Sequence, residues 1–325
     1  MLNKKVILIT GGTGSFGQKM TATILKNYKP EKLIIFSRDE MKQFEMKQRF
    51  NQECIRYFIG DVRDSKRLHR AFAGVDYIFH AAALKIVPTA EYDPFEAVKT
   101  NILGAENIVN AAIDNKVKKI VALSTDKACN PVNLYGATKL CAEKLFIAAN
   151  NYSGRAGTQF SVVRYGNVFG SRGSVIPFFR ECNKTGEVPI TDNRMTRFWI
   201  TLSQGCQIVL NALKEMNGGE IFIPKLPSMK ITDLAKVICP KAKQKVIGIR
   251  PGEKLHETLL SADDGIDSYE FKDKYVIYPK IYAFEGRKIE KGKYLGIDFQ
   301  GYTSANNTIW LNVEQLKRLV ENEGI

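Results

Sequence analysis

The feature that most constrains this chain is a glycine-rich turn close to the N-terminus. The stretch VILITGGTGSFGQK places Gly11, Gly14 and Gly17 after a short apolar run and at the start of a segment with helical character. At this spacing the first glycine permits a tight turn, the second leaves room for a pyrophosphate, and the third lets the helix pack against the sheet. Free N–H groups at the start of the helix then face the phosphates. The turn predicts a dinucleotide-binding site, to which three further residues contribute: Thr13, Ser15 and Phe16.

The first half of the chain alternates short apolar runs with longer amphipathic segments. The predicted strands are residues 5–10, 32–37, 55–60, 76–83, 118–124 and 159–166. The predicted helices are residues 15–25, 41–50, 65–72, 94–113 and 135–149. This alternation is typical of an α/β fold: a doubly wound parallel sheet of the Rossmann type, covered by helices on both faces.

The rhythm loosens after about residue 165. Helices are predicted at 170–182, 229–238 and 308–321, and strands at 219–225 and 244–252. We therefore expect residues 1–165 to form a nucleotide-binding domain. Residues 166–325 are expected to form mainly a smaller, irregular substrate-binding lobe, from which part of the chain returns to the first domain.

Composition narrows the class of protein. The formal net charge is +14 for 325 residues, which fits either a lysine-rich surface or attraction of a phosphorylated ligand. No RNA-binding or zinc-finger motif occurs, so nucleic acid is not expected as a partner. The six cysteines form no C-x-x-C pair, which favours reduced thiols and no metal site. No apolar run approaches the roughly 20 residues of a membrane helix, so we expect a cytoplasmic protein without a membrane partner.

The residues after the second predicted strand indicate which dinucleotide binds. An acidic residue about 20 positions after the glycine turn normally bonds the ribose 2′-hydroxyl of NAD. Ser37 stands at that position and Arg38 follows it. A hydroxyl and a guanidinium suit a 2′-phosphate, and Lys42 adds positive charge one helical turn later. The pattern favours NADP(H), although Asp39 leaves NAD open.

Two later strands supply further candidate cofactor contacts. Asp61 and Val62 follow the third strand, where they are expected to flank the adenine. Ala81 and Ala82 follow the fourth strand, and their small side chains would let a nicotinamide ribose lie close. His80, which precedes them, is predicted to be a hydrogen-bonded core histidine and not a catalyst.

A polar cluster lies near the middle of the chain, in STDKACNPVNLYGATK. The fifth predicted strand ends at residue 124, so Thr125, Asp126 and Lys127 emerge at the carboxyl edge of the sheet, where ligands bind in open α/β folds. Tyr135 and Lys139 lie four residues apart on one face of the next helix. A nearby ammonium favours the phenolate, so Tyr135 is expected to take a hydroxyl proton while hydride leaves the adjacent carbon. Thr125 is expected to hold that hydroxyl.

With these motifs in view, the chain resembles the extended short-chain dehydrogenase/reductase family. TGGTGSFG, DVRD, HAAALK, STDKACNPVNLYGATK and RYGNVFGSRGSVIP follow the order of that family's motifs. A narrower resemblance is to the inverting UDP-N-acetylglucosamine 4,6-dehydratases of flagellin glycosylation, carried by SRDEMKQFEM, MTRFWIT, GGEIFIPKLPSMK and GIRPGEKLHE. It covers about Lys5 to Glu257 and gives no guidance from about Ser261 on. Ile86 stands where relatives have histidine. This departure puts in doubt whether any role of that histidine applies to this chain.

The resemblance implies a reaction. The expected activity is NADP-dependent 4,6-dehydration of UDP-N-acetylglucosamine with inversion at C5, giving a UDP-2-acetamido-2,6-dideoxy-L-arabino-hexos-4-ulose, as the first step of pseudaminic acid-type synthesis. It implies that Lys127, neutral beside other cations, removes the C5 proton and that Asp126, protonated, gives a proton to the departing C6 hydroxyl. Lys85 is implied for cofactor and substrate contacts, and a homo-oligomer is implied for the assembly.

The resemblance also assigns Asn167 to the sugar diphosphate. Planar guanidinium groups suit bidentate phosphate binding, and Arg250 is the strongest candidate for the pyrophosphate. The other candidate substrate-binding residues are Arg172, Arg194, Thr196, Arg197 and Glu253.

Two alternatives remain open from the sequence. One is a UDP-sugar 4-epimerase on the same scaffold, against which the Asp126–Lys127 pair argues because epimerisation needs no such acid and base. The other is an NADP(H)-sensing protein without turnover, against which the Tyr135–Lys139 pair argues.

Overall fold

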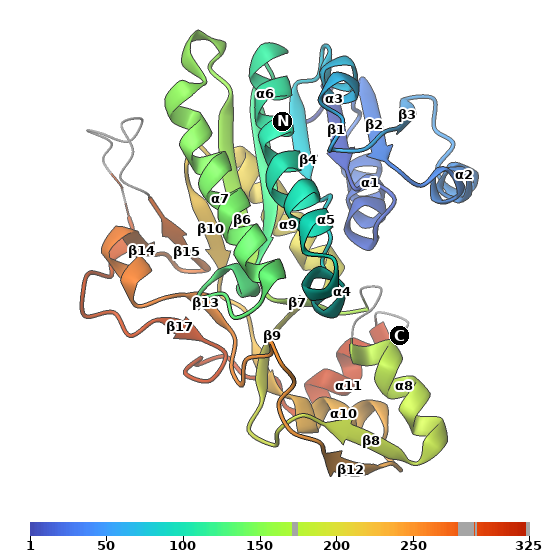
Figure 1. The fold of residues 1–325 in the computed structure, drawn as a ribbon, viewed down its shortest axis with the longest axis vertical. Coiled ribbons are helices and arrows are strands. Elements are labelled where there is room, and N and C mark those ends of the chain that lie inside the picture. The colour runs from blue at the N-terminus through green and yellow to red at the C-terminus, as the bar shows by residue number, and fades with distance from the viewer. Residues whose placement is uncertain (171–174, 279–288, 290, 323–325) are drawn as a thin grey trace.

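The structure is a computed structural model that describes residues 1–170, 175–278, 289 and 291–322. A large sheet forms its upper lobe (Figure 1). The strands of this sheet are β1 (Val6–Thr10), β2 (Lys32–Ser37), β3 (Ile55–Ile59), β4 (Tyr77–His80), β5 (Lys119–Thr125), β6 (Gln159–Tyr165), β10 (Ile221–Pro224), β14 (Ser268–Glu270), β15 (Lys274–Ile277) and β16 (Lys293–Tyr294).

The strand order in this 10-stranded sheet is β16-β14-β15-β10-β6-β5-β4-β1-β2-β3. In this order, every neighbouring pair from β10 through β6, β5, β4, β1 and β2 to β3 is parallel. Strands β15, β14 and β16 add an antiparallel edge next to β10. Every residue of β1 is buried, as expected for a central parallel strand that is covered on both faces.

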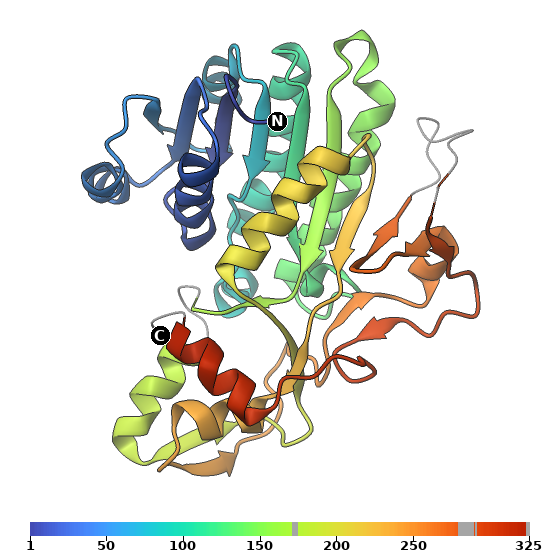
Figure 2. The same ribbon diagram turned by 180° about the vertical axis from the view of Figure 1, so that it is seen from behind.

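Helices cover both faces of the sheet. They are α1 (Ser15–Asn27), α2 (Glu40–Arg49), α3 (Ser65–Phe72), α4 (Val87–Tyr92), α5 (Pro94–Val98), α6 (Gly104–Asp114), α7 (Leu134–Tyr152) and α9 (Leu202–Glu215). Helices α6 and α7 lie on the face toward the viewer in Figure 1, and α1 and α9 on the face toward the viewer in Figure 2. This arrangement confirms the predicted doubly wound α/β fold.

The smaller lobe lies below the carboxyl edge of the parallel strands in Figure 1. Its helices are α8 (Val175–Thr185), α10 (Ile231–Ile238) and α11 (Val313–Asn322). Its strands are β7 (Asn167–Val168), β8 (Glu187–Ile190), β9 (Thr196–Ile200), β11 (Ser228–Lys230) and β12 (Lys243–Val246), and a further pair is β13 (Thr258–Leu260) with β17 (Tyr302–Thr303). A separate apolar cluster that includes Phe169, Trp199 and Leu316 forms its core.

The long helix predicted at 94–113 is interrupted. A π-helical turn, Lys99–Leu103, separates α5 from α6. It turns the buried Asn101 toward the loop after β4, where its amide bonds the N–H and C=O of Leu84, both at 2.9 Å. These two hydrogen bonds fix the position of that loop at the carboxyl edge of the sheet. Short π-helical turns are often found at functional sites.

Several other expectations differ from the structure, among them the fourth strand, which ends at His80 and not at Ala83, and the last helix, which begins at Val313 and not at Thr308. Helix α9 is absent from the predicted elements, yet Thr201 and Gln204 form a capping box at its start. The strand predicted at 244–252 is limited to β12. Strand β5 extends one residue further than expected because Thr125 pairs with Tyr165 of β6. Within the described ranges, no helix combines the length and the apolar character needed to cross a bilayer.

Candidate active site

The glycine turn after β1 has the geometry that the sequence predicts. Gly11 has φ +64°, a left-handed conformation, and a Cβ there would lie 2.8 Å from the amide nitrogen of Ala82. A Cβ on Gly17 would lie 2.4 Å from the carbonyl oxygen of Gly12, which is the predicted close packing at the helix start. A Cβ on Gly14 would meet only the Gly11 oxygen, at 3.2 Å, so the space above this residue is open.

The same turn leaves the start of α1 available to an anion. Its N-cap is Gly14, which provides no side-chain cap. The first N–H groups of the helix therefore donate no hydrogen bond to a cap side chain and are available to a phosphate. Thr13 is buried, and Ser15 and Phe16 begin the helix.

The residues expected to select NADP(H) lie at the carboxyl end of β2. Ser37 is buried, and its hydroxyl accepts a hydrogen bond from Gln43 at 3.0 Å. Arg38 is half exposed and lies 3.5 Å from the Asp61 carboxylate. Asp39 caps α2 by accepting from the Lys42 N–H at 2.9 Å, and it also pairs with the Lys42 ammonium. The Lys42 ammonium is thus already paired with Asp39, so Arg38 is the cation more available to a 2′-phosphate.

The remaining cofactor candidates lie next to the glycine turn or beside Arg38. Burial opposes ionisation of Asp61, but hydrogen bonds from Arg63 outweigh it and lower the pKa of Asp61. Val62 is buried, and Ala81 and Ala82 approach Gly11 from the end of β4. His80 is a core histidine, as predicted, because it is buried and its Nδ1 lies 2.8 Å from the Thr10 hydroxyl.

The structure brings Thr125, Asp126 and Lys127 together in one bonded group. The Thr125 hydroxyl donates to Asp126 Oδ1 at 2.9 Å, and the Lys127 ammonium donates to the same oxygen at 3.0 Å. Asp126 is fully buried, and its Oδ2 has no hydrogen-bond partner among the described residues. Burial raises the pKa of Asp126, against the opposing charge of Lys127.

Tyr135 and Lys139 lie on the first turns of α7 beside this group. Burial raises the pKa of Tyr135 to about 12, while the Lys127 charge and a hydrogen bond with Thr125 act in the opposite direction. Lys139 is buried and donates to the Leu123 carbonyl at 2.7 Å. Burial lowers the pKa of Lys139 to about 8. The cation that acts most directly on the phenol is therefore Lys127.

The charge state of Lys127 differs from the sequence expectation. Its ammonium lies 3.0 Å from Asp126 Oδ1 and 3.5 Å from Glu257 Oε1, so two carboxyl groups flank it. Burial disfavours the ammonium, but these two groups outweigh burial and the Arg197 charge and raise the pKa of Lys127. The two neighbouring carboxyl groups therefore favour the charged form of Lys127, whereas the sequence had suggested only cationic neighbours. The neighbouring Lys85 has a lowered pKa from burial and from the Lys127 charge.

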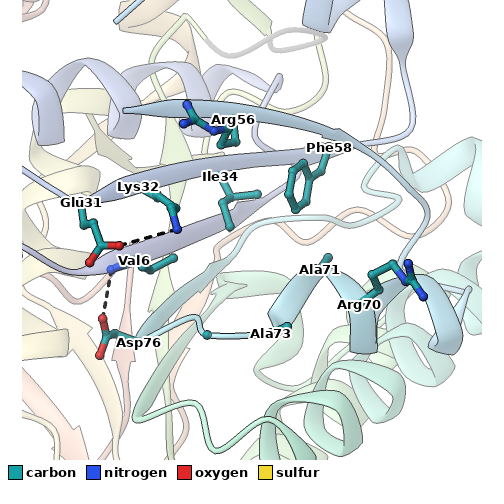
Figure 3. Close-up of a pocket in the computed structure, with 11 residues that line it drawn as sticks. Val6, Glu31, Lys32, Ile34, Arg56, Phe58, Arg70, Ala71, Ala73 and Asp76 are labelled. Carbon is teal, nitrogen blue, oxygen red and sulfur yellow. Dashed lines mark hydrogen bonds and ion pairs between the residues drawn. The ribbon is translucent and has the colours of Figure 1, made fainter. Parts of the chain in front are cut away.

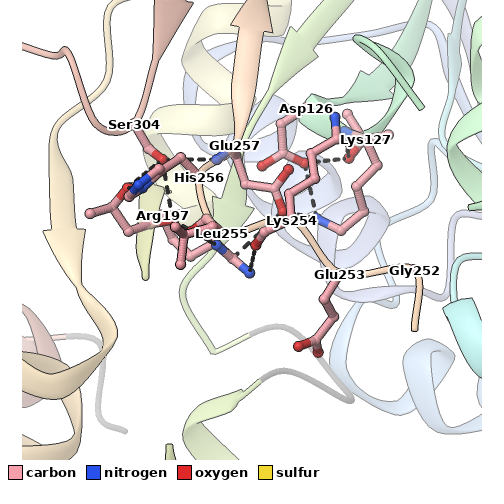
Figure 4. Close-up of polar contacts among 12 residues, drawn as sticks. Asp126, Lys127, Arg197, Gly252, Glu253, Lys254, Leu255, His256, Glu257 and Ser304 are labelled. Atoms are coloured by element: carbon pink, nitrogen blue, oxygen red, sulfur yellow. Dashed lines mark hydrogen bonds and ion pairs between the residues drawn. The ribbon is translucent and has the colours of Figure 1, made fainter. Parts of the chain in front are cut away.

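The segment after β12 supplies the second acidic neighbour. Figure 4 shows residues 252–257 passing beside the Asp126–Lys127 pair, with Glu257 directed toward it. Arg197 anchors this segment, because its guanidinium donates to the carbonyls of Leu255 at 3.1 Å and Lys254 at 2.9 Å. The Lys254 ammonium donates to the Cys129 carbonyl at 2.5 Å, two residues after Lys127.

The predicted substrate-binding residues divide into two groups. Thr196 and Arg197 are buried, and their polar atoms are engaged within the protein, with Thr196 Oγ1 2.7 Å from both His256 Nδ1 and Ser304 Oγ. This arrangement argues against direct phosphate contact by either residue. Arg194 is exposed, and its guanidinium donates hydrogen bonds to both carboxylate oxygens of Asp192.

The other group is still available to a ligand. Arg250 is half exposed, and its one ion pair among the described residues is a long one, at 3.8 Å to Glu253. Asn167 lies at the start of β7, and its Oδ1 is buried without a partner in the described chain. Glu253 points away from the Asp126–Lys127 pair in Figure 4. Arg172 falls outside the described residues.

Two residues that the sequence reasoning missed fix the start of α7. A Cβ on Gly136 would lie 2.1 Å from the carbonyl oxygen of Lys127, so only glycine lets Tyr135 and Lys127 approach. Asn133 caps the helix by accepting from Gly136 N at 2.8 Å, and its amide donates to Gly252 at 2.8 Å. Both lie inside the stretch already singled out, but the bond from Asn133 to the distant segment at 252–257 could not be read from it.

A cavity of about 650 Å³ lies near the amino ends of β1 and β2, away from the carboxyl edge of the sheet (Figure 3). It is bounded by the first residues of β1 and β2 and by the end of α3. The residues that line it are Val6, Glu31, Lys32, Ile34, Arg56, Phe58, Arg70, Ala71, Ala73, Gly74 and Asp76. None of the predicted catalytic or binding residues belongs to it, so the chemistry is assigned to the carboxyl edge.

Comparisons with known proteins agree with the α/β fold described above. The family model described as polysaccharide biosynthesis protein matches residues 7–279. The chain is 56% identical to the UDP-N-acetylglucosamine 4,6-dehydratase (inverting) of Campylobacter jejuni subsp. jejuni serotype O:2, over 99% of each chain. It is 42% identical to a UDP-glucose 4-epimerase of Rickettsia massiliae, over 98% of this chain and 96% of the relative. The X-ray structure of Pen from Bacillus thuringiensis aligns with a TM-score of 0.92 and 39% identity, over 100% of this chain and 99% of that one.

Proposed function

We propose a function from one premise: the chain belongs to the polysaccharide biosynthesis protein family, within the extended short-chain dehydrogenases/reductases. We propose that it is a hydro-lyase that removes water from UDP-N-acetylglucosamine between C4 and C6, with NADP(H) as cofactor and inversion at C5. The bonded group of Thr125, Asp126 and Lys127, joined to Tyr135 at the carboxyl edge of the sheet, carries this proposal. The identity of 56% to an inverting dehydratase over nearly the whole chain supports it.

The residues of the glycine turn fit the cofactor. Gly14 leaves the space that a pyrophosphate needs, the first turn of α1 has no side-chain cap, and Arg38 can pair with a 2′-phosphate. When bound, the nicotinamide supplies reversible hydride transfer, which oxidises C4 and later reduces C6. The assignment to NADP(H) in place of NAD(H) rests on Ser37 and Arg38.

Tyr135 is the proposed base for the C4 hydroxyl. With a pKa raised to about 12 by burial it is a phenol near neutral pH, and it must lose that proton to act. The Lys127 ammonium already lowers the pKa, and the positive charge of an oxidised nicotinamide acts in the same direction. Tyr135 therefore depends on both cations, and Thr125, which bonds the phenol, is placed to orient the hydroxyl.

Asp126 and Lys127 are the proposed acid and base of the elimination. A proton shift from Lys127 Nζ to Asp126 Oδ1, across 3.0 Å, converts carboxylate and ammonium into acid and amine with no change in net charge. The amine then takes the C5 proton, and the acid gives its proton to the C6 hydroxyl, which leaves as water. After this step the pair again holds a carboxylate and an ammonium. The cycle closes when C6 has been reduced and C5 takes up a proton on the face opposite to the one that lost it, which inverts C5.

The test of this assignment uses Asp126→Asn. The amide cannot donate an acidic proton, but Tyr135 and the cofactor site stay intact. We expect the variant to oxidise C4, seen as reduced-nicotinamide fluorescence on adding UDP-N-acetylglucosamine, and to lose water at least a hundredfold more slowly than the wild type. Water loss at the wild-type rate would remove Asp126 from the mechanism.

The second candidate is a UDP-sugar 4-epimerase. The observation that favours it is the 42% identity to a relative named UDP-glucose 4-epimerase. Epimerisation requires hydride removal and return at C4 alone, so it gives no task to an acid and a base at Asp126 and Lys127. An epimerase should tolerate Asp126→Asn with little loss of rate, and its product has the mass of the substrate.

Self-association, a cytoplasmic location and a place at the start of pseudaminic acid-type synthesis belong to the same proposal. Exposed aromatic side chains support self-association, since Tyr92 of α4 and Phe95 of α5 are 87% and 74% exposed. Light scattering after size exclusion is expected to give a mass above that of one chain. A single-chain mass at micromolar concentration would contradict it.

A further inference from the structure

Glu257 is a buried carboxylate with no part in the reaction as described above. It is 3% exposed and lies directly before β13. Its Oε1 is 3.5 Å from Lys127 Nζ and 3.6 Å from Arg197 Nε, and its Oε2 has no hydrogen-bond partner among the described residues. A buried carboxylate is costly unless cations compensate it, so its position between two cations calls for an explanation beyond packing.

The backbone fixes Glu257 independently of those cations. Its N–H donates to Ser304 Oγ at 2.9 Å, and the carbonyl of Glu257 accepts from Ser304 N at 2.8 Å. Ser304 in turn bonds Thr196 Oγ1 at 2.7 Å, on β9 beside Arg197. Figure 4 shows the Glu257 side chain extending from this segment toward the Asp126–Lys127 pair. The carboxylate is therefore held in place by the fold and does not depend on Lys127 for its position.

We infer that Glu257 is a positioning residue of the elimination: it holds the Lys127 side chain against Asp126 and supplies the negative charge that governs how this pair shares its protons. The inference rests on the proposed dehydratase function. Glu257 is assigned no contact with the substrate, because its side chain is only 4% exposed whereas that of Lys127 is 25% exposed. It acts through Lys127 and Asp126 alone.

The electrostatics have a definite sign. A carboxylate beside Lys127 raises the pKa of that ammonium, and the same negative charge raises the pKa of Asp126. Burial opposes ionisation of Glu257, but its cationic neighbours outweigh burial and lower its pKa, so the charge is present at neutral pH. The titratable and charged groups around the pair, from every element that faces it, are Asp126, Lys127, Tyr135, Lys85, Arg197, Lys254 and Glu257.

The test compares the pH dependence of kcat in three variants. Glu257→Gln keeps the shape and removes the charge, so both limbs of the profile are expected to move to lower pH by about one unit, with kcat at neutral pH at least tenfold lower. KM for the nucleotide sugar should change less than threefold. Glu257→Asp withdraws the charge by one methylene and should move the limbs in the same direction by less. Ser304→Ala removes one of the two hydrogen bonds that hold the Glu257 backbone but keeps the other and keeps the charge, so it should move the limbs less than either substitution of Glu257.

The outcomes separate the two claims. If the wild type removes no water from UDP-N-acetylglucosamine, the proposed function fails before the variants are compared. If the wild type is active and the Glu257→Gln profile superimposes on it, or shifts no more than that of Ser304→Ala, the role of Glu257 is refuted. Should Glu257→Gln fail to fold by circular dichroism, Glu257→Asp decides, and an unshifted profile in that variant overturns the inference.

Discussion

A matched pair of alanine substitutions in the glycine turn separates cofactor binding from folding. Gly14 has φ −72° and ψ 170°, which alanine adopts without strain, and its Cβ would have one neighbour within 4 Å, the Gly11 oxygen at 3.2 Å. Gly17 lies inside α1, and its Cβ would meet backbone atoms of Gly12 at 2.4 to 2.6 Å. The two substitutions add the same methyl group three residues apart, one toward open space and one into the main chain.

The expected magnitudes follow from these contacts. Gly14→Ala should change the free energy of unfolding by no more than about 1 kcal/mol, because the restriction of the unfolded chain by alanine and the 3.2 Å contact with the Gly11 oxygen act in opposite directions. Its methyl group occupies the space assigned to the pyrophosphate, so NADPH binding should weaken at least tenfold, or about 1.4 kcal/mol. Gly17→Ala must displace backbone and should lose about 1–3 kcal/mol of stability.

The assay uses cofactor-free protein. Urea unfolding followed by circular dichroism gives the stabilities, and NADPH fluorescence titration on folded protein gives the affinities. The reasoning is refuted if Gly14→Ala binds NADPH as the wild type does, or if it loses as much stability as Gly17→Ala.

Three further perturbations test separate parts of the account. Arg38→Ala should raise the KM for NADP(H) tenfold or more while that for NAD(H) changes little, since a charged hydrogen bond contributes about 1.5–3 kcal/mol; equal changes for both would dismiss Arg38 as the 2′-phosphate ligand. Tyr135→Phe should lower kcat by about 10²–10⁴ with unchanged NADPH affinity, and substantial residual turnover would require another base. Burial lowers the pKa of His80 from 6.5 to about 3, so unfolded chains take up a proton that the fold excludes, and stability is lost as pH falls below 6.5. Between pH 7 and 5 this costs the wild type about 2 kcal/mol; His80→Gln should lose that much less over the same interval in urea unfolding, and parallel curves would contradict the buried neutral imidazole.

Much of the fold was predictable because its signals are local. The glycine turn, the alternating runs and the Tyr135–Lys139 spacing are each short-range patterns, so the doubly wound parallel sheet and the carboxyl-edge location of Thr125 followed from them. The π-turn after α5 was not predictable from apolar spacing, because it accompanies hydrogen bonds between Asn101 and Leu84, which lies in another loop.

The charge state of the site depended on contacts that sequence spacing does not show. Lys254 bonds Cys129 from 125 residues away, and the segment that carries it also brings Glu257 to Lys127. Without that segment, a neutral Lys127 is the natural expectation, whereas two carboxyl groups keep it charged. The expectation that Arg197 binds phosphate fails for the same reason: its spacing fits, but only the fold shows that it is directed inward toward the carbonyls of Lys254 and Leu255.

The most direct test of the central claim is the structure of the product formed from UDP-N-acetylglucosamine. The purified chain is incubated with the nucleotide sugar and NADP⁺, and the product is examined by mass spectrometry and by NMR for the configuration at C5. The account predicts the loss of one water, a 4-keto-6-deoxy sugar and the L-arabino configuration. A product of unchanged mass with inverted C4 would establish the epimerase in its place, and a dehydrated product with C5 retained would contradict the proposed inversion.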